Sequence, residues 1–268
     1  MRAVVRIFRL IRFAVTLVGH AVVLQLTSRT QRKVSPGQHA SRALRHASQA
    51  FVRILKIDVQ LSNNTEGLSS PGLIVCNHLG VTDPLILASQ LDICFAAKSE
   101  MEKWPVMGPV CKSVGTVFVQ RDRRMATSQF VDDIVSRLKD GVSVLVFPEG
   151  TTSSGDTIRP FKTGSFEAMT YLRDRMIVPI LLHVKSVNGS SAVSDKRLLS
   201  WFEPGQSLFG NFWKILGIKG AEVEICVGNP INVGKQSRKE LAEIAFAAMQ
   251  ELHERLNPLN GSLEPKKS

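Results

Sequence analysis

The sequence predicts an α/β fold, in which a mostly parallel sheet has helices on both faces and follows an N-terminal amphipathic helical hairpin. Between residues 73 and 184, short apolar runs typical of strands alternate with helical segments, the pattern of a covered parallel sheet. Residues 1–57 contain no Asp or Glu. A length of 268 residues fits one large domain with an extension. We therefore expect a membrane-associating hairpin over 1–57, an α/β domain over 58–256 and a flexible tail over 257–268.

The start of the chain reads as a basic and apolar helix. Arg2, Arg6, Arg9 and Arg12 recur at helical spacing, and Phe13 to Leu26 carries no charge. That uncharged run is shorter than the roughly 20 residues with which a helix crosses a bilayer. The sequence therefore leaves open whether this helix spans a membrane or enters one leaflet.

A second basic helix is expected from His39 to Ile57, after a turn at Pro36-Gly37. Two such helices favour a hairpin lying partly in one leaflet, with its cations on lipid phosphates. The alternative is an ordinary amphipathic hairpin packed on its own domain. A cleaved signal peptide is disfavoured because TSRTQRK follows the apolar run instead of a small-residue cleavage site.

The net charge of +11 comes entirely from this arm. Residues 1–57 hold 11 of the 34 Lys and Arg, so the rest of the chain balances 23 basic against 23 acidic residues. A neutral body with a basic, apolar arm predicts contact with anionic membrane lipid and argues against nucleic acid as a partner. Cysteines at 76, 94, 111 and 226 form no CxxC pair, which predicts reduced thiols in a cytosol-facing protein and no metal site.

The domain that follows alternates strands and helices. Strands are expected at 73–76, 94–97, 116–120, 142–147 and 177–184, and helices at 84–91, 104–113, 125–139 and 163–175. Ligands of such sheets gather beyond the carboxyl ends of the strands. Because His78, Arg121 and Glu149 each follow a predicted strand, one edge of the sheet could hold all three.

The remaining segments are less informative. Residues 60–72 are rich in turn formers and read as a linker, and Glu222 to Val227 alternates like an edge strand. A strong amphipathic helix runs from Ser237 to Leu256, opened by a capping pattern. The aromatic residues between 186 and 220 are read as satellite core, with an acyl-chain or membrane contact as the alternative.

The strongest chemical signal is CNHLGVTDP, residues 76–84. It places the imidazole of His78 five residues before the carboxylate of Asp83, just after an apolar run. A carboxylate on one imidazole nitrogen fixes the tautomer and stabilises the imidazolium that forms when the other nitrogen takes a proton. His78 is therefore a candidate general base and Asp83 its orienter, although spacing alone is weak support.

Three further blocks follow in order: GTVFVQR at 115–121, FPEGTTS at 147–153 and VPI at 178–180. Together with NHLGVTD at 77–83, this set resembles the glycerolipid acyltransferases of the lysophosphatidic acid acyltransferase family. The resemblance covers about residues 70–185, and its specificity lies in the joint occurrence of the four blocks.

The resemblance implies roles for named residues. His78 and Asp83 would be catalytic. Arg121 would bind the acceptor's phosphate, with a solvated charge cluster as the alternative, and Glu149 would bind acceptor hydroxyls or organise its loop. The other substrate-binding candidates are Gly150, Thr151, Thr152 and Lys162, and the motif residues are Asn77, Gly115, Phe118, Phe147, Pro148 and Pro179. The backbone amides of residues 150–153 could form an anion nest.

The sequence departs from the family at one position. Phosphatidate-forming members typically carry Arg where this chain has Thr152. A hydroxyl cannot replace a full charge on a phosphate dianion, so the acceptor is open at this point, and Arg159 or Lys162 are candidates for the missing charge.

The expected activity is transfer of a fatty acyl group from acyl-CoA or acyl carrier protein to the hydroxyl of a lysolipid. The first candidate acceptor is 1-acyl-sn-glycerol-3-phosphate, and the alternative is lyso-ornithine lipid or another lysophospholipid. We expect no cofactor and no metal, and a location at the cytoplasmic face of the bacterial inner membrane. No Gly-x-Ser-x-Gly elbow surrounds the serines, so direct attack is preferred to an acyl-enzyme. The rival from another class is a non-catalytic lipid-binding protein.

Overall fold

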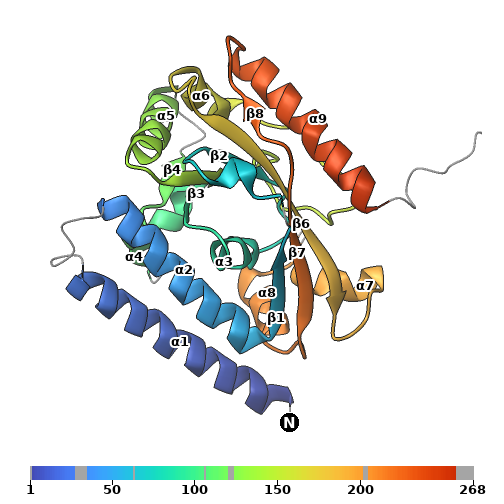
Figure 1. The fold of residues 1–268 in the computed structure, drawn as a ribbon. Helices are drawn as coiled ribbons and strands as arrows, with labels where there is room; N and C mark the ends of the chain where they lie inside the picture. Colours follow the sequence, from blue (N-terminus) through green and yellow to red (C-terminus); the bar gives the residue numbers. More distant parts are fainter. Residues whose placement is uncertain are drawn as a thin grey trace, which may run out of the picture.

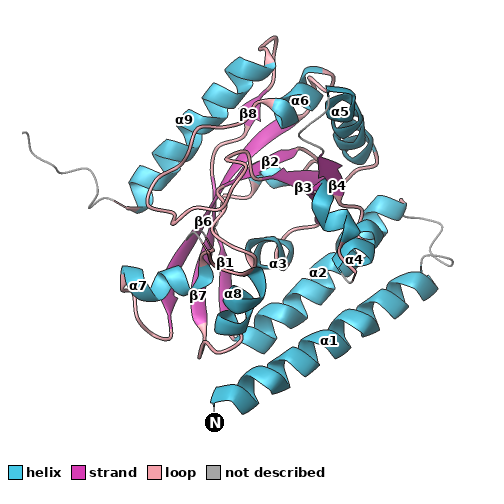
Figure 2. Ribbon diagram, turned by 180° about the vertical axis from the view of Figure 1, so that it is seen from behind, coloured by secondary structure: helices cyan, strands magenta, loops and turns pink. Residues whose placement is uncertain are grey.

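A computed structural model describes residues 2–27, 35–62, 64–105, 107–119, 124–201 and 205–257. Figure 1 and Figure 2 show a twisted central sheet with helices on both of its faces. The strands are β1 (Ile57–Leu61), β2 (Leu73–Cys76), β3 (Ile93–Lys98), β4 (Val117–Val119), β5 (Ser143–Val146), β6 (Met176–Val187), β7 (Ala221–Val227) and β8 (Ile231–Asn232). The helices are α1 (Arg2–Thr27), α2 (Pro36–Leu55), α3 (Asp83–Ala88), α4 (Met107–Ser113), α5 (Arg124–Lys139), α6 (Glu167–Thr170), α7 (Val193–Lys196), α8 (Leu208–Ile215) and α9 (Arg238–Leu256).

The sheet is mixed and mostly parallel. Its order is β1-β7-β6-β2-β5-β3-β4, and β8 pairs with β6 outside this path. Strands β6, β2, β5, β3 and β4 run parallel to one another, whereas β6 is antiparallel to β7 and β8. The carboxyl ends of β2, β5 and β4 therefore lie at one edge, as predicted, and the predicted fold class is confirmed.

Each face of the sheet has its own hydrophobic layer. One layer joins α2, α3 and α8 to the sheet, and its fully buried side chains include Phe51, Leu87 and Ile215. The other joins α5, α6 and α9, and includes Ile134 and Met169. Burial of strands on both faces explains why their sequences read as continuous apolar runs.

Helices α1 and α2 lie side by side in both views. Ser35 caps α2 through a hydrogen bond from the Gln38 amide, and Pro36 stands in its first turn, a position that proline favours. Helix α2 therefore begins at Pro36-Gly37, where the sequence predicted a turn before the helix. The helix also ends at Leu55 and not at Ile57, because Ile57 begins β1.

The hairpin is packed on the domain through α2, and part of α1 joins it. The Phe13 ring of α1 meets Phe51 of α2 edge-on, with ring centroids 5.0 Å apart. Arg9 turns inward and is only 7% exposed, so it does not share a solvent-facing arginine face with Arg12. Among the described residues, no helix is long and apolar enough to cross a membrane.

Three predicted elements were wrong. Residues 57–61, expected to end a helix and begin a linker, form β1 at the sheet edge. Strand β7, expected at an edge, lies between β1 and β6. The helix expected over 163–175 is reduced to a 3₁₀ turn at Gly164–Phe166 followed by the single turn of α6.

Other expectations were confirmed. Helix α9 begins with a capping box in which Ser237 and Glu240 exchange hydrogen bonds. In the aromatic segment, Phe212 and Trp213 pack against the core, whereas Phe209 is 69% exposed. Phe202 lies outside the described residues.

Candidate active site

Asn77 fixes the direction in which the chain leaves β2. Its side chain donates from Nδ2 to the carbonyl of Leu182 at 3.1 Å and accepts the Leu182 amide at 2.7 Å. The bonds are buried, and they continue the pairing of β2 with β6 by one residue after the strand ends. His78 is thereby placed at the carboxyl end of β2, as expected.

Asp83, the first residue of α3, orients the imidazole of His78. Its Oδ2 lies 2.8 Å from Nδ1 of His78, and accepts the amides of Leu79 at 2.6 Å and Gly80 at 2.8 Å. This carboxylate is buried, and the side chain of His78 is 22% exposed. An ionised carboxylate can only accept hydrogen bonds, so the proton between the two groups is on Nδ1 of His78. Nε2 then keeps its lone pair. The geometry leaves His78 able to accept a proton from a substrate.

The loop after β5 supports His78 from two sides. Phe147 stacks on the imidazole with centroids 4.0 Å apart and planes 12° apart. Glu149 accepts the His78 amide at Oε1 and the Arg159 amide at Oε2, both at 3.1 Å. Because Glu149 is 4% exposed and both oxygens hold backbone amides, it organises the loop, the second of the two roles expected for it. The stacking of Phe147 was not predicted, since nothing in a pattern of residue types shows which ring faces another.

The burial of Glu149 gives a pH-dependent prediction. Burial raises the pKa of its carboxyl above 4.5, and the two amide hydrogen bonds offset part of this rise. A raised carboxyl pKa stabilises the fold most below the unfolded-state value, and this contribution is lost as pH rises through the folded-state value. We expect Glu149→Gln to destabilise the fold by about 1–3 kcal/mol, because the NH2 group of the glutamine side chain would face a backbone N–H in place of an acceptor oxygen.

That loss should be larger at about pH 4 than at about pH 8, since the glutamine side chain of the variant has no carboxyl to ionise. Denaturant unfolding of both proteins at the two pH values measures the difference. Glu167→Gln, at a half-buried carboxylate on α6, is the control. A loss that grew with pH would contradict the raised pKa.

The loop after Glu149 brings the other predicted residues together. Gly150 has φ +73°, and a Cβ there would lie 2.8 Å from Cε of Lys162, so glycine is needed both for the turn and for the lysine that crosses it. Thr151 is exposed and Thr152 half-buried. The turn is closed by the Lys162 amide, which donates to the carbonyl of Pro148 at 2.8 Å.

The expected anion nest differs in the structure. The amide of Gly150 donates to Phe147 O at 3.0 Å, and that of Ser153 to His78 O at 2.8 Å. These two groups are used inside the protein, so at most the amides of Thr151 and Thr152 remain for a ligand.

A segment that sequence reasoning missed closes the His78 loop from the far side. The Trp201 amide donates to Leu79 O at 2.8 Å, and a Cβ on Gly80 would lie 2.3 Å from Leu199 O. Gly80 therefore permits a close backbone contact between the loop and residues 199–201. The glycine in NHLGVTD indicates a close backbone contact, but the sequence does not show which segment makes it.

The remaining motif residues are structural in this geometry. Gly115 has φ +75° and its carbonyl accepts Nε of Arg137 at 3.0 Å, Phe118 is half-buried on β4, and Pro179 pairs with Val75 inside the sheet. Arg121, predicted to bind phosphate, lies outside the described residues. Within the described segments, no group of three or more His, Cys, Asp or Glu side chains is placed to hold a metal ion.

The family model named Acyltransferase matches residues 56–183. The chain is 29% identical over 181 residues to a lyso-ornithine lipid O-acyltransferase of Rhizobium meliloti, covering 65% of this chain and 62% of that protein. It is 34% identical over 181 residues to the protein of the same name from Brucella abortus, covering 64% of this chain and 67% of that protein. The chain thus spans less than two thirds of the first relative's length.

Two further proteins are similar to this chain in sequence or in fold. A 1-acyl-sn-glycerol-3-phosphate acyltransferase of Neisseria meningitidis is 28% identical over 150 residues, 55% of this chain and 59% of that protein. The crystal structure of the 1-acyl-sn-glycerophosphate acyltransferase of Thermotoga maritima superimposes with a TM-score of 0.67 at 21% identity, covering 100% of both chains. At that identity the structural match supports the fold.

Proposed function

Since the chain belongs to the Acyltransferase family, we propose that it is a lysolipid O-acyltransferase. It transfers a fatty acyl group from acyl-CoA or acyl carrier protein to the free hydroxyl of a lysolipid. The observation that carries the proposal is the hydrogen bond between His78 Nδ1 and the buried carboxylate of Asp83 at 2.8 Å, on an imidazole that solvent can reach.

In the proposed reaction, Nε2 of His78 takes the proton of the acceptor hydroxyl as its oxygen attacks the thioester carbonyl. The carbon–sulfur bond then breaks, and the departing thiolate takes the proton back from the imidazolium. Asp83 stabilises the imidazolium in between, and Phe147 keeps the ring in its plane. One ester and one thiol are formed, and His78 returns to its starting state.

The serines of the site support direct transfer without an acyl-enzyme. Ser153 Oγ lies 3.5 Å from the main-chain carbonyl of His78, and Ser154 Oγ donates to Asp156 Oδ2 at 2.7 Å. Neither contact is with the imidazole ring, whereas a serine nucleophile needs the base within hydrogen-bond reach of its hydroxyl.

The proposed acceptor is a lyso-ornithine lipid. Thr152 brings no charge to the loop beside His78, and the two relatives described first carry this acceptor in their names. The alternative acceptor is 1-acyl-sn-glycerol-3-phosphate, which the Neisseria relative's name supports. Lys162 lies across Gly150 and Arg159 is exposed in the same loop, so this loop retains cations for an acidic head group.

The acceptor is tested with the detergent-purified chain, labelled acyl-CoA or acyl carrier protein, and a panel of lysolipids. We expect transfer to lyso-ornithine lipid, and we expect Thr152→Arg to move preference towards lysophosphatidate by about tenfold, because a charge-assisted hydrogen bond to phosphate is gained. Thr157→Arg, at an exposed position in the following loop, is the control. Transfer to no lysolipid would support the lipid-binding alternative and contradict the proposal.

The proposal includes a membrane surface as the site of action. Helix α1 exposes Val4, Ile7, Phe8, Ile11, Val15, Val18 and Val22, each at 49% or more, next to the basic residues of the hairpin. A contiguous exposed apolar face beside cations favours contact with anionic lipid. Sedimentation with anionic vesicles, compared with zwitterionic ones, tests this part of the proposal. Binding to neither kind of vesicle would contradict it.

A further inference from the structure

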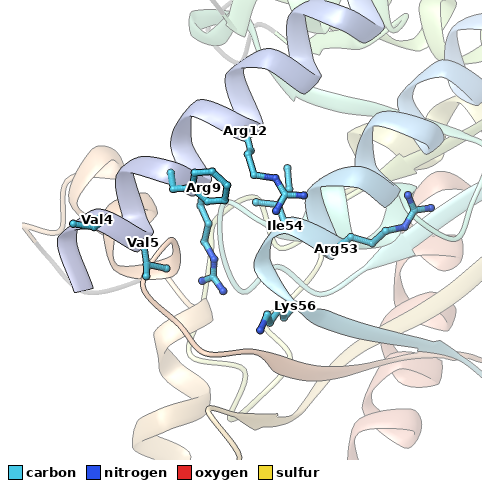
Figure 3. Close-up of a pocket in the computed structure, with 8 residues that line it drawn as sticks. Val4, Val5, Arg9, Arg12, Arg53, Ile54 and Lys56 are labelled. Atoms are coloured by element: carbon cyan, nitrogen blue, oxygen red, sulfur yellow. The ribbon is translucent and has the colours of Figure 1, made fainter. Parts of the chain in front are cut away.

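A groove lies between the start of α1 and the end of α2, apart from the site around His78. It is a shallow groove open to solvent, with a volume of about 350 Å³, and is lined by Val4, Val5, Phe8, Arg9, Arg12, Arg53, Ile54 and Lys56. Four of these eight residues are cations and the other four are apolar. In Figure 3, Arg9, Arg12 and Lys56 extend toward the space between the two helices, and Arg53 extends away along α2.

Among the described residues, no carboxylate pairs with the charges of the groove. Residues 1–57 contain no Asp or Glu. Arg12 lies over the Phe8 ring, with its guanidinium carbon 5.7 Å from the centroid. Arg12, Arg53 and Lys56 are exposed, whereas Arg9 is buried. Neighbouring cations repel one another, so an anion placed among them lowers their energy.

Arg9 makes this clearest, because it is 7% exposed. Its Nη1 donates to the carbonyls of Leu216 at 3.0 Å and Ile218 at 2.5 Å, which are neutral. Burial, followed by the charge of Arg12, lowers the pKa of Arg9. The guanidinium of Arg9 is thus held by main-chain carbonyls, and its charge adds to that of Arg12 beside the groove.

Lys56 gives a second and independent indication. It caps α2 in the left-handed conformation, with φ 58° and ψ 44°, where glycine is the favoured residue. Non-glycine residues in this conformation cluster at binding and other functional sites. Lys56 is also one of the residues that line the groove (Figure 3).

We propose that this groove binds one molecule of anionic phospholipid, with the phosphate between Arg12 and Lys56 and the start of an acyl chain along Val4, Val5 and Phe8. The combination of cations and apolar side chains matches an amphiphile, which an inorganic ion would satisfy only in part. The lipid is bound at a defined position, distinct from the diffuse attraction of a basic hairpin to a charged surface. The inference goes beyond acyl transfer, since no lining residue belongs to the site around His78.

The test is native mass spectrometry of the detergent-purified full chain titrated with phosphatidylglycerol, phosphatidylcholine or inorganic phosphate. We expect one phosphatidylglycerol to bind about tenfold more tightly than phosphatidylcholine. Arg12→Gln and Lys56→Gly should each weaken this binding about tenfold, the effect of one charge-assisted hydrogen bond. No acyl donor is present, so the result is independent of whether the chain transfers acyl groups.

Two controls separate the groove from general charge and from misfolding. Arg42→Gln removes an exposed cation of α2 that lies about three turns before Arg53. This variant should leave lipid binding unchanged. Lys56→Gly should unfold at the same or a higher temperature than the unmodified chain, because glycine adopts the cap conformation without strain. Equal losses in Arg42→Gln and Arg12→Gln would overturn a defined site, and displacement of the lipid by an equal concentration of inorganic phosphate would overturn the assignment to a lipid.

Discussion

His78→Ala should lower the rate constant of acyl transfer by about a thousandfold or more, since a positioned general base contributes about 10²–10⁴. The substitution removes the imidazole that Asp83 orients, and with it the lone pair on Nε2. The side chain is partly exposed, so the melting temperature should change little. Steady-state kinetics with saturating acyl donor and acceptor measure the loss.

His46→Ala, at an exposed histidine on α2, is the matched control and should keep the full rate. Binding of the lysolipid should also survive in His78→Ala, because its effect lies on the chemical step. A His78→Ala protein that retained more than about a tenth of the rate would exclude the proposed base, given the size of effect expected of one.

Asp83→Asn should separate catalysis from stability. An asparagine oxygen can take the place of Oδ2 and still accept the amides of Leu79 and Gly80, so the loop should keep its shape. The charge that stabilises the imidazolium is lost, and we expect the rate to fall by about two to four orders of magnitude. Thermal unfolding and acyl-transfer kinetics on the same preparation give the comparison.

Asp83→Ala is the companion variant, and it should lose both properties. It leaves two backbone N–H groups without an acceptor in a buried loop, which costs about 2–4 kcal/mol in the free energy of unfolding. If Asp83→Asn were as unstable as Asp83→Ala, the loop would depend on the charge itself, and loss of activity could not be assigned to the imidazolium. If Asp83→Asn remained fully active, Asp83 would have no catalytic part.

The features predicted correctly from the sequence are local ones. His78 and Asp83 are five residues apart, so a strand end followed by a tight turn is enough to bring them together. The capping box of α9 spans Ser237 to Glu240 and is equally local. Buried parallel strands such as β2 and β5 can also be predicted from the sequence, because they are apolar on both faces.

The features that were missed depend on distant partners. Residues 57–61 are too short and mixed to read as a strand, and they become one because β7 supplies its backbone groups at Ala221–Ile225. Arg9 has the same spacing as its neighbouring arginines, yet it is buried, because the carbonyls of Leu216 and Ile218 meet it there. The position of Trp201 over the His78 loop is a third case. No pattern within either segment specifies such pairs.

The attachment of α1 through Arg9 has a consequence for the order of assembly during translation. Arg9 and Ile218 are 209 residues apart, and a ribosome adds about 5–20 residues per second. The helix is therefore complete roughly 10–40 seconds before its carbonyl partners have been synthesised. Through that interval α1 lacks the two carbonyls that later hold Arg9. The schedule of synthesis therefore sets the earliest time at which this attachment can form.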